Sequence, residues 1–327
     1  MESGTSKITP IFIFSLPRSG STLLQKIIAS SNEVSTSSEP WILLPLLYSQ
    51  KEEGTLSEYS HKKAVLALND VKQRLLDHSK NFDDVLVNFI LSVYEGLSNP
   101  NSKYFLDKTP RYYLIIEEIS NIFPNAKFIF LFRNPLAQFA SKMNTHKGRF
   151  KTLHSAIVDI GKGPNLLVSG YKQLQEGSIK INYSELVNDS KLVIRRIENY
   201  LNIKIDESVL NNLSEIDIKG VMGDPTLMAN KASKISSISI DKWKTVFNSP
   251  LRRQIAIWYL ETIDEEYYRA LGISKAHIKG ELKKVKIEYF KYPKDYFDLV
   301  YCYISMRFKP SLIFSKKFNW TKYVRLS

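Results

Sequence analysis

The chain has 327 residues, and its 46 Lys and Arg against 33 Asp and Glu give a net charge of +13. Apolar residues make up 43% of it, yet no uninterrupted apolar run approaches the ~20 residues that a membrane span requires. The single cysteine, Cys302, excludes an intramolecular disulfide. Composition therefore predicts a globular protein of a reducing compartment and argues against disulfide scaffolds and helical membrane proteins.

The first informative segment is IFIFSLPRSGST at residues 11–22, an apolar strand-like run that breaks into a polar turn and then a helix-like stretch. Backbone N–H groups, hydroxyls and a guanidinium would gather there at a helix N-terminus, which predicts a site for a phosphate or sulfate group. It is not a Walker A loop, because the lysine of that motif is missing. An ordinary strand–turn–helix connection would also use these residue types. The candidate anion-binding residues are Pro17, Arg18, Ser19, Gly20, Ser21 and Thr22.

A second segment of the same kind is KFIFLFRNPLAQFAS at residues 127–141. Asn134 suits a helix N-cap and Pro135 the first helical position, so Arg133 would lie at the carboxyl end of a strand and Ser141 along the next helix. Ligands of open parallel sheets bind outside those strand ends. The alternative is an arginine that only pairs locally.

Strands and helices are predicted to alternate along the chain. Strands are expected near residues 11–15, 104–107, 127–132 and 178–183, and long helices over 62–78, 82–97, 152–175 and 250–271. This order predicts an α/β fold with a P-loop-like parallel sheet flanked by helices on both faces. Residues 219–239 are rich in Gly, Pro, Lys and Ser and are interpreted as a functional loop or lid.

The two segments, in their order and spacing, resemble the sulfotransferases that use 3′-phosphoadenosine 5′-phosphosulfate (PAPS). FLDKTP at 105–110 and SSEPW at 37–41 are similar to segments of the arginine-loop branch, which includes tyrosylprotein sulfotransferases and many bacterial sulfotransferases. The resemblance extends from Ile8 to about Ile273. It implies that the 17–22 loop grips the 5′-phosphosulfate, while Arg133 and Ser141 grip the 3′-phosphate.

The resemblance also implies catalytic roles for Arg18, Lys108 and Glu39, the last as the general base that takes the acceptor proton. Taken alone, Lys108 would be a solvated lysine at a strand end, and Glu39 would favour the dipole of a helix over residues 40–48. His146 and His154 are the next candidates for the base, although surface or core positions suit them better.

Three later residues, Tyr183, Ser233 and Lys242, resemble cofactor contacts of the family. Their ordinary alternatives are a core aromatic, a loop serine and a solvated lysine. PAPS is the expected co-substrate, and no metal is expected because the five histidines and one cysteine lack zinc-binding spacing.

We expect a sulfotransferase domain over residues 1–275 and a basic, aromatic-rich extension over 276–327. The extension has 12 Lys and Arg, 4 Asp and Glu, and 12 aromatic residues. It predicts either an additional helical layer with a solvated face or peripheral contact with an anionic membrane. No signal peptide or membrane anchor is visible, which favours the cytoplasm.

The predicted function is transfer of a sulfuryl group to a hydroxyl of a carbohydrate, lipid, peptide or small metabolite, with no nucleic-acid partner. A P-loop-like phosphotransferase would share the fold, but it should have a GK[ST] loop and an acidic residue after an apolar strand. A non-catalytic anion- or membrane-binding protein would explain the basic extension alone. Fold cannot separate these alternatives.

Overall fold

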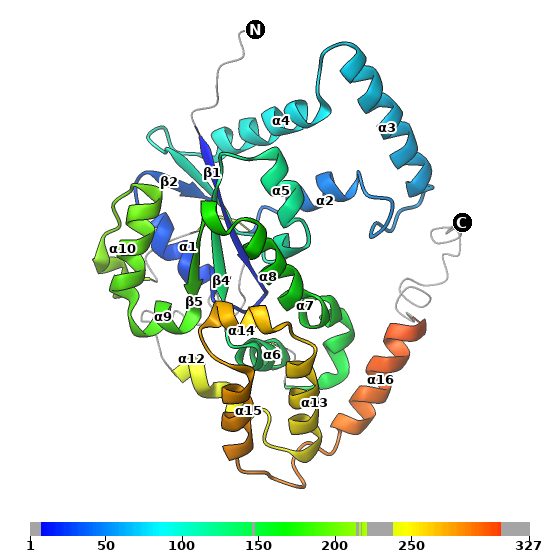
Figure 1. The fold of residues 1–327 in the computed structure, drawn as a ribbon, viewed down its shortest axis with the longest axis vertical. Coiled ribbons are helices and arrows are strands. Elements are labelled where there is room, and N and C mark those ends of the chain that lie inside the picture. The colour runs from blue at the N-terminus through cyan, green and yellow to red at the C-terminus, as the bar shows by residue number, and fades with distance from the viewer. Residues whose placement is uncertain (1–7, 146–147, 214–215, 217, 221–237, 309–327) are drawn as a thin grey trace.

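Five parallel strands form one sheet at the centre of the protein (Figure 1). The computed structural model describes residues 8–145, 148–213, 216, 218–220 and 238–308. The strand order is β2-β3-β1-β4-β5, so β1 lies in the middle. The strands are β1 (Thr9–Ser15), β2 (Val34–Thr36), β3 (Tyr104–Asp107), β4 (Lys127–Phe132) and β5 (Ser178–Asn182).

Helices fill the connections between strands and the region after β5. The α-helices are α1 (Ser21–Ala29), α2 (Leu43–Tyr48), α3 (His61–Asp77), α4 (Phe82–Leu97), α5 (Ile116–Ile122), α6 (Pro135–Asn144), α7 (Ile157–Gly161), α8 (Gly163–Gln173), α9 (Tyr183–Asn188), α10 (Ser190–Leu201), α12 (Ile238–Asp241), α13 (Pro250–Glu261), α14 (Glu265–Leu271), α15 (Lys275–Lys284) and α16 (Asp295–Phe308). Short 3-10 helices are η1 (Tyr112–Leu114), η2 (Phe150–Ser155), η3 (Gln175–Gly177), η4 (Glu207–Leu210) and η5 (Lys242–Thr245).

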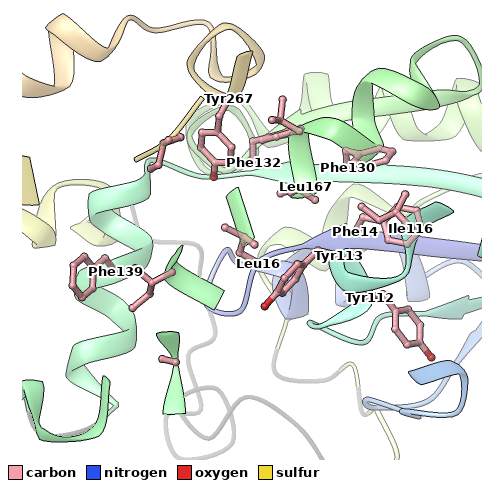
Figure 2. Close-up of a cluster of buried hydrophobic side chains, with 14 of the residues drawn as sticks. Phe14, Leu16, Tyr112, Tyr113, Ile116, Phe130, Phe132, Phe139, Leu167 and Tyr267 are labelled. Carbon is pink, nitrogen blue, oxygen red and sulfur yellow. The ribbon is translucent and has the colours of Figure 1, made fainter. Parts of the chain in front are cut away.

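The two central strands separate aromatic from aliphatic side chains. Because successive residues of a strand point to opposite faces, Phe12 and Phe14 enter one buried cluster while Ile11 and Ile13 enter the other. The aromatic cluster includes residues of α4, α5 and α8, whereas the aliphatic cluster includes residues of α1 and α10. Figure 2 shows part of the aromatic cluster, with Phe14 and residues of β4. Helices therefore cover both faces of the sheet, as the sequence predicted.

The structure differs from the expected elements in three places. The short strand β2 was not predicted, and the expected helix over 152–175 is divided among η2, α7 and α8. The expected helix over 250–271 ends at Glu261 and begins again at Glu265. The expected lid falls mostly on residues 221–237, outside the described residues.

The C-terminal helices continue from the core toward the surface. In α15, Ile278 and Leu282 belong to the aromatic cluster, whereas α16 exposes many apolar side chains. Among the described residues, no helix is long and apolar enough to cross a membrane. The division into 1–275 and 276–327 stays a prediction.

Candidate active site

The carboxyl ends of the five strands bring the candidate residues together along one edge of the sheet. Each residue follows its strand within three positions. The strand order therefore arranges five side chains in a row along this edge: Glu39 after β2, Lys108 after β3, Arg18 after β1, Arg133 after β4 and Tyr183 after β5. Residues that are 69 positions apart, Glu39 and Lys108, and 115 positions apart, Arg18 and Arg133, thus become neighbours at one edge of the sheet.

The loop between β1 and α1 has the backbone of an anion-binding turn. Arg18 and Gly20 both have left-handed backbone conformations, with φ of 71° and 92°. Gly20 is the N-cap of the nine-residue helix α1, and no side chain caps the N–H groups of its first turn. The Ser19 hydroxyl is buried and has no hydrogen-bond partner within the described part of the chain. Uncapped N–H groups and a buried, unpaired hydroxyl fit a bound phosphate or sulfate group.

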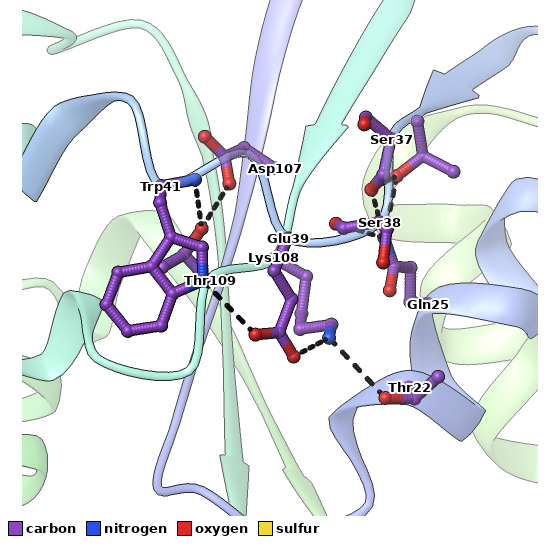
Figure 3. Close-up of polar contacts among 10 residues, drawn as sticks. Thr22, Gln25, Ser37, Ser38, Glu39, Trp41, Asp107, Lys108 and Thr109 are labelled. Atoms are coloured by element: carbon purple, nitrogen blue, oxygen red, sulfur yellow. Dashed lines mark hydrogen bonds and ion pairs between the residues drawn. The ribbon is translucent and has the colours of Figure 1, made fainter. Parts of the chain in front are cut away.

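Lys108 connects this loop to the segment that carries Glu39 (Figure 3). Its Nζ lies 2.8 Å from Glu39 Oε1 and 3.4 Å from Thr22 Oγ1. The indole N–H of Trp41 donates to the other carboxylate oxygen of Glu39 at 3.3 Å. The Lys108 side chain is 1% exposed and that of Glu39 12%. Lys108 is therefore not a solvated strand-end lysine, and Glu39 precedes α2, which begins only at Leu43.

The residue before Lys108 is a buried carboxylate, Asp107, which the sequence analysis missed. Asp107 is fully buried and accepts hydrogen bonds from the hydroxyls of Tyr94 at 2.7 Å, Tyr112 at 2.8 Å and Thr109 at 3.1 Å. Burial raises the pKa of Asp107 to about 6, although the hydrogen bonds and the Lys108 charge oppose that rise. This network fixes the end of β3 and hence the starting point of the Lys108 side chain.

The other half of the candidate site gathers residues around Arg133. The Nη1 of Arg133 donates to the Arg18 carbonyl at 2.7 Å, and its guanidinium lies 4.1 Å from the centre of the Tyr183 ring. The Nε of Arg18 donates to Ser141 Oγ at 3.3 Å. The Tyr267 hydroxyl, from α14, donates to the Arg133 carbonyl at 2.9 Å. The two anion-binding segments found in the sequence are thus in direct contact.

Two buried glutamines, also missed from sequence, tie the loop and the Glu39 segment to the neighbouring helices. Gln138 on α6 donates to the Pro17 carbonyl at 3.0 Å. Gln25 on α1 donates to Thr36 Oγ1 and to the Ser37 carbonyl, both at 2.8 Å. The sequence could have indicated both glutamines, because each is an amide side chain on an otherwise apolar helix face and a buried polar group requires a hydrogen-bond partner.

Neither Lys242 nor His154 takes part in the contacts described above. Lys242 begins η5 and, with Asn144 and Arg149, lines a cavity of about 720 Å³ beside the end of α6. Ser233 and His146 fall outside the described residues. The His154 ring packs edge-on against Tyr301 of α16, with ring centres 6.3 Å apart. Within the described ranges, no group of three or more His, Cys, Asp or Glu is arranged to hold a metal ion.

Comparison with known proteins agrees with this arrangement. The sulfotransferase family model matches residues 10–207, a span that contains β2 to β5, all of β1 except Thr9, and more than half of the chain. The chain belongs to the sulfotransferase family. This membership places it among the transferases.

Individual relatives are distant. The nodulation protein NoeE of Sinorhizobium fredii is 26% identical over 134 residues, which are 41% of this chain and about a third (31%) of that protein. Protein-tyrosine sulfotransferase 1 of Danio rerio is 23% identical, over 76% of this chain and 69% of its own length. The sulfotransferase domain from the curacin biosynthetic pathway shares the fold, with a TM-score of 0.52 and 22% identity, over 81% of this chain and 96% of that domain.

Proposed function

We propose that the protein transfers a sulfuryl group from PAPS to an acceptor hydroxyl. The observation that carries this proposal is the buried contact between Lys108 and Glu39, beside Thr22 of the anion-binding loop. Such a transfer needs a carboxylate that accepts a proton and a cation that stabilises negative charge, both close to the anion-binding loop. A binding protein would have no need to bury this pair, because burying opposite charges carries a desolvation cost.

Arg133, Ser141 and Tyr183 would hold the nucleotide end of the donor. The guanidinium of Arg133 lies at the carboxyl end of β4 over an aromatic ring, and the Ser141 hydroxyl is 3.3 Å from Arg18 Nε. Such a cluster of fixed positive charge suits a phosphate group. We assign the 3′-phosphate to Arg133 and Ser141, and the 5′-phosphosulfate to Arg18 and the α1 N-terminus.

In the proposed step, Glu39 accepts the proton of the acceptor hydroxyl as that oxygen bonds to sulfur. The bond between sulfur and the bridging phosphate oxygen breaks in the same in-line displacement. Lys108 and Arg18 stabilise the negative charge that develops on the departing phosphate oxygen. The products are a sulfate ester and 3′-phosphoadenosine 5′-phosphate, and the proton remains on Glu39 until solvent removes it.

The acceptor stays open among hydroxyls of carbohydrates, lipids, peptides and small metabolites. The similarity to a protein named as a protein-tyrosine sulfotransferase supports a tyrosine hydroxyl as one acceptor to test. The cytoplasm stays our predicted location. We also still predict that the protein needs no metal and has no nucleic-acid partner. Lys242 and Ser233 stay proposed cofactor contacts, and peripheral membrane contact stays a proposal for the extension.

Titration calorimetry with 3′-phosphoadenosine 5′-phosphate and with 5′-AMP tests the proposal. We expect much tighter binding of the first nucleotide, because 5′-AMP leaves Arg133 and Ser141 without a phosphate partner. A transfer assay with sulfur-labelled PAPS and a panel of hydroxyl acceptors then tests the chemistry. Equal affinity for the two nucleotides would overturn the assigned site.

A further inference from the structure

Helix α16 buries two aspartates and a serine and exposes most of its large apolar side chains. Asp295 and Asp298 are 3% and 2% exposed, and Ser305 is 7% exposed. The outward face consists of large apolar residues that cover one broad side of the helix, given its period of 3.6 residues. They are Tyr296 (63% exposed), Phe297 (78%), Val300 (60%), Tyr301 (44%), Tyr303 (64%) and Ile304 (44%). This is the reverse of an ordinary surface helix.

Ion pairs of two buried aspartates fix this orientation. Arg252 of α13 is 1% exposed and makes two hydrogen bonds with Asp295, at 2.5 and 2.9 Å. Arg149, whose side chain is 46% exposed, donates to Asp298 through Nε at 3.0 Å and Nη2 at 2.5 Å. Rotating the helix to hide its apolar face would break both pairs and leave the buried Arg252 without its charged partner, which is strongly unfavourable. The exposed face is therefore built into the fold.

The segment before α16 extends the apolar surface and surrounds it with positive charge. Tyr289 and Phe290 are 77% and 97% exposed. Exposed cations lie before the helix and in its last turn: Lys286, Lys294 and Arg307. All four acidic residues between 276 and 308 have cationic partners, since Glu281 pairs with Lys244 and Lys284, Glu288 with Lys291, and the two aspartates with arginines.

We propose that this face, residues 286–307, docks the protein in the plane of an anionic lipid bilayer. Tyrosine and phenylalanine side chains suit the boundary between headgroups and acyl chains, and lysines suit lipid phosphates. A helix of 14 residues is about 21 Å long, too short to span a core of about 30 Å. Phe290 and Phe297 project from the surface, which suits insertion into lipid better than a flat contact with a protein.

The position of α16 is compatible with this role. The helix lies at the periphery of the molecule, apart from the sheet (Figure 1). It packs on η2 through its inward side, and Cys302 on that side is 4% exposed. None of the outward residues belongs to the candidate active site described above. Docking and nucleotide binding can therefore be measured independently.

Co-sedimentation of the full chain with vesicles tests the proposal. We expect binding to vesicles of phosphatidylcholine mixed with phosphatidylglycerol, weaker binding to phosphatidylcholine alone, and release as the salt concentration rises. The double variant Phe297→Ser/Tyr303→Ser should lose about tenfold or more in vesicle affinity. The matched control is Val85→Ser/Phe89→Ser on α4, where both side chains are 54% exposed. It should bind vesicles as the parent does.

A second pair of variants separates charge from apolar contact. Lys286→Gln/Lys294→Gln should reduce the preference for anionic vesicles and the salt dependence, whereas Lys62→Gln/Lys63→Gln at the start of α3 should leave both unchanged. Circular dichroism and 3′-phosphoadenosine 5′-phosphate binding establish that each variant is folded. The proposal is overturned if the parent shows no preference for anionic vesicles or if both aromatic pairs behave alike. It is also overturned if analytical ultracentrifugation shows a dimer that only Phe297→Ser/Tyr303→Ser dissociates, because the face would then join two copies of the chain.

Discussion

The two halves of the candidate active site hold their charges in different ways. In the half formed by β2 and β3, Lys108 and Glu39 face each other directly and are almost removed from water. In the half formed by β4 and β5, Arg133 lies between a backbone carbonyl and the ring of Tyr183. In our proposal the first half exchanges a proton and shifts charge during the reaction. The second half presents a fixed positive charge, which suits anchoring a ligand.

The largest effect is expected at Glu39, and it should separate the two halves. Glu39→Gln removes the proposed base, so turnover should fall about 10²–10⁴-fold in the sulfuryl-transfer assay. The affinity for 3′-phosphoadenosine 5′-phosphate should change little, because Glu39 is proposed to contact the acceptor hydroxyl and not the nucleotide. The variant should also unfold more easily, since it leaves Lys108 buried without a charged partner.

Glu33→Gln is the matched control for Glu39. Glu33 also pairs with a lysine, Lys103, but that lysine side chain is 64% exposed and the pair is not part of the candidate active site. Turnover of this control should equal that of the parent. If Glu39→Gln kept turnover within a few-fold of the parent, the base would have to be sought elsewhere, with His146 and His154 next.

At Arg133 the expected defect is in binding. Arg133→Ala should weaken 3′-phosphoadenosine 5′-phosphate by about 2–4 kcal/mol, the range for a broken charge-assisted contact, with a much smaller effect on 5′-AMP. Arg196→Ala on α10, where the side chain is 40% exposed and paired with Glu185, serves as the control in the same calorimetric titration. Equal losses for the two nucleotides would contradict the assignment of the 3′-phosphate.

The ionisation of Asp107, which lies beside Lys108, should make the stability of the folded protein depend on pH. Its pKa is raised from 3.8 to about 6 in the folded protein, so the native state binds more protons than the unfolded state between those values. Stability from this group is therefore greatest below about pH 4 and is lost as the pH rises to 6, by up to about 3 kcal/mol. Asp107→Asn keeps an oxygen to accept the tyrosine hydroxyls but cannot ionise. Urea unfolding from pH 4 to 7 should show a smaller decline for the variant, and parallel curves would refute this account.

The smallest effect is expected at Gly20, in the loop that both halves share. A Cβ there would lie 2.3 Å from Cε2 of Tyr183, and the φ of 92° is unfavourable for any other residue. Gly20→Ala should cost about 1–2 kcal/mol of stability and weaken nucleotide binding, because the ring must move away from Arg133. At Gly177 a Cβ would meet nothing within 4 Å, so Gly177→Ala is the control in thermal unfolding. Equal shifts in both variants would show that Tyr183 does not depend on Gly20.

Much of the anchoring half could be predicted from the sequence, because its signals are local. The β4 segment and the start of α6 carry a strand pattern, an N-cap and an N1 proline, and Asn134 does accept hydrogen bonds from Leu136 and Ala137. The same pattern places Arg133 at the carboxyl end of the strand and Ser141 along the following helix. The apolar run of β1 likewise predicted a strand, and the alternation of strands and helices predicted a sheet covered on both faces.

The other half could be predicted only in part, because its contacts join distant segments. A three-residue strand such as β2 has too few residues to show a pattern, and the pairing of Glu39 with Lys108 spans 69 positions. Asp107 ends a strand in the sequence, and only the folded chain brings the hydroxyls of Tyr94 and Tyr112 to it. The sequence did not predict the orientation of α16 either, because the partners of its buried aspartates, Arg149 and Arg252, lie far away along the chain.

The hydrogen bond from Tyr267 to the Arg133 carbonyl has a consequence for the order in which a newly made chain acquires its structure. All five strands are complete by Asn182, so the ribosome has released the whole sheet well before α14 emerges. We expect the sheet to assemble on the growing chain while Arg133 still lacks this support. The proposed nucleotide should then bind well only once α14 has formed, and its addition should protect the 327-residue chain from proteolysis far more than chains ending before Glu265.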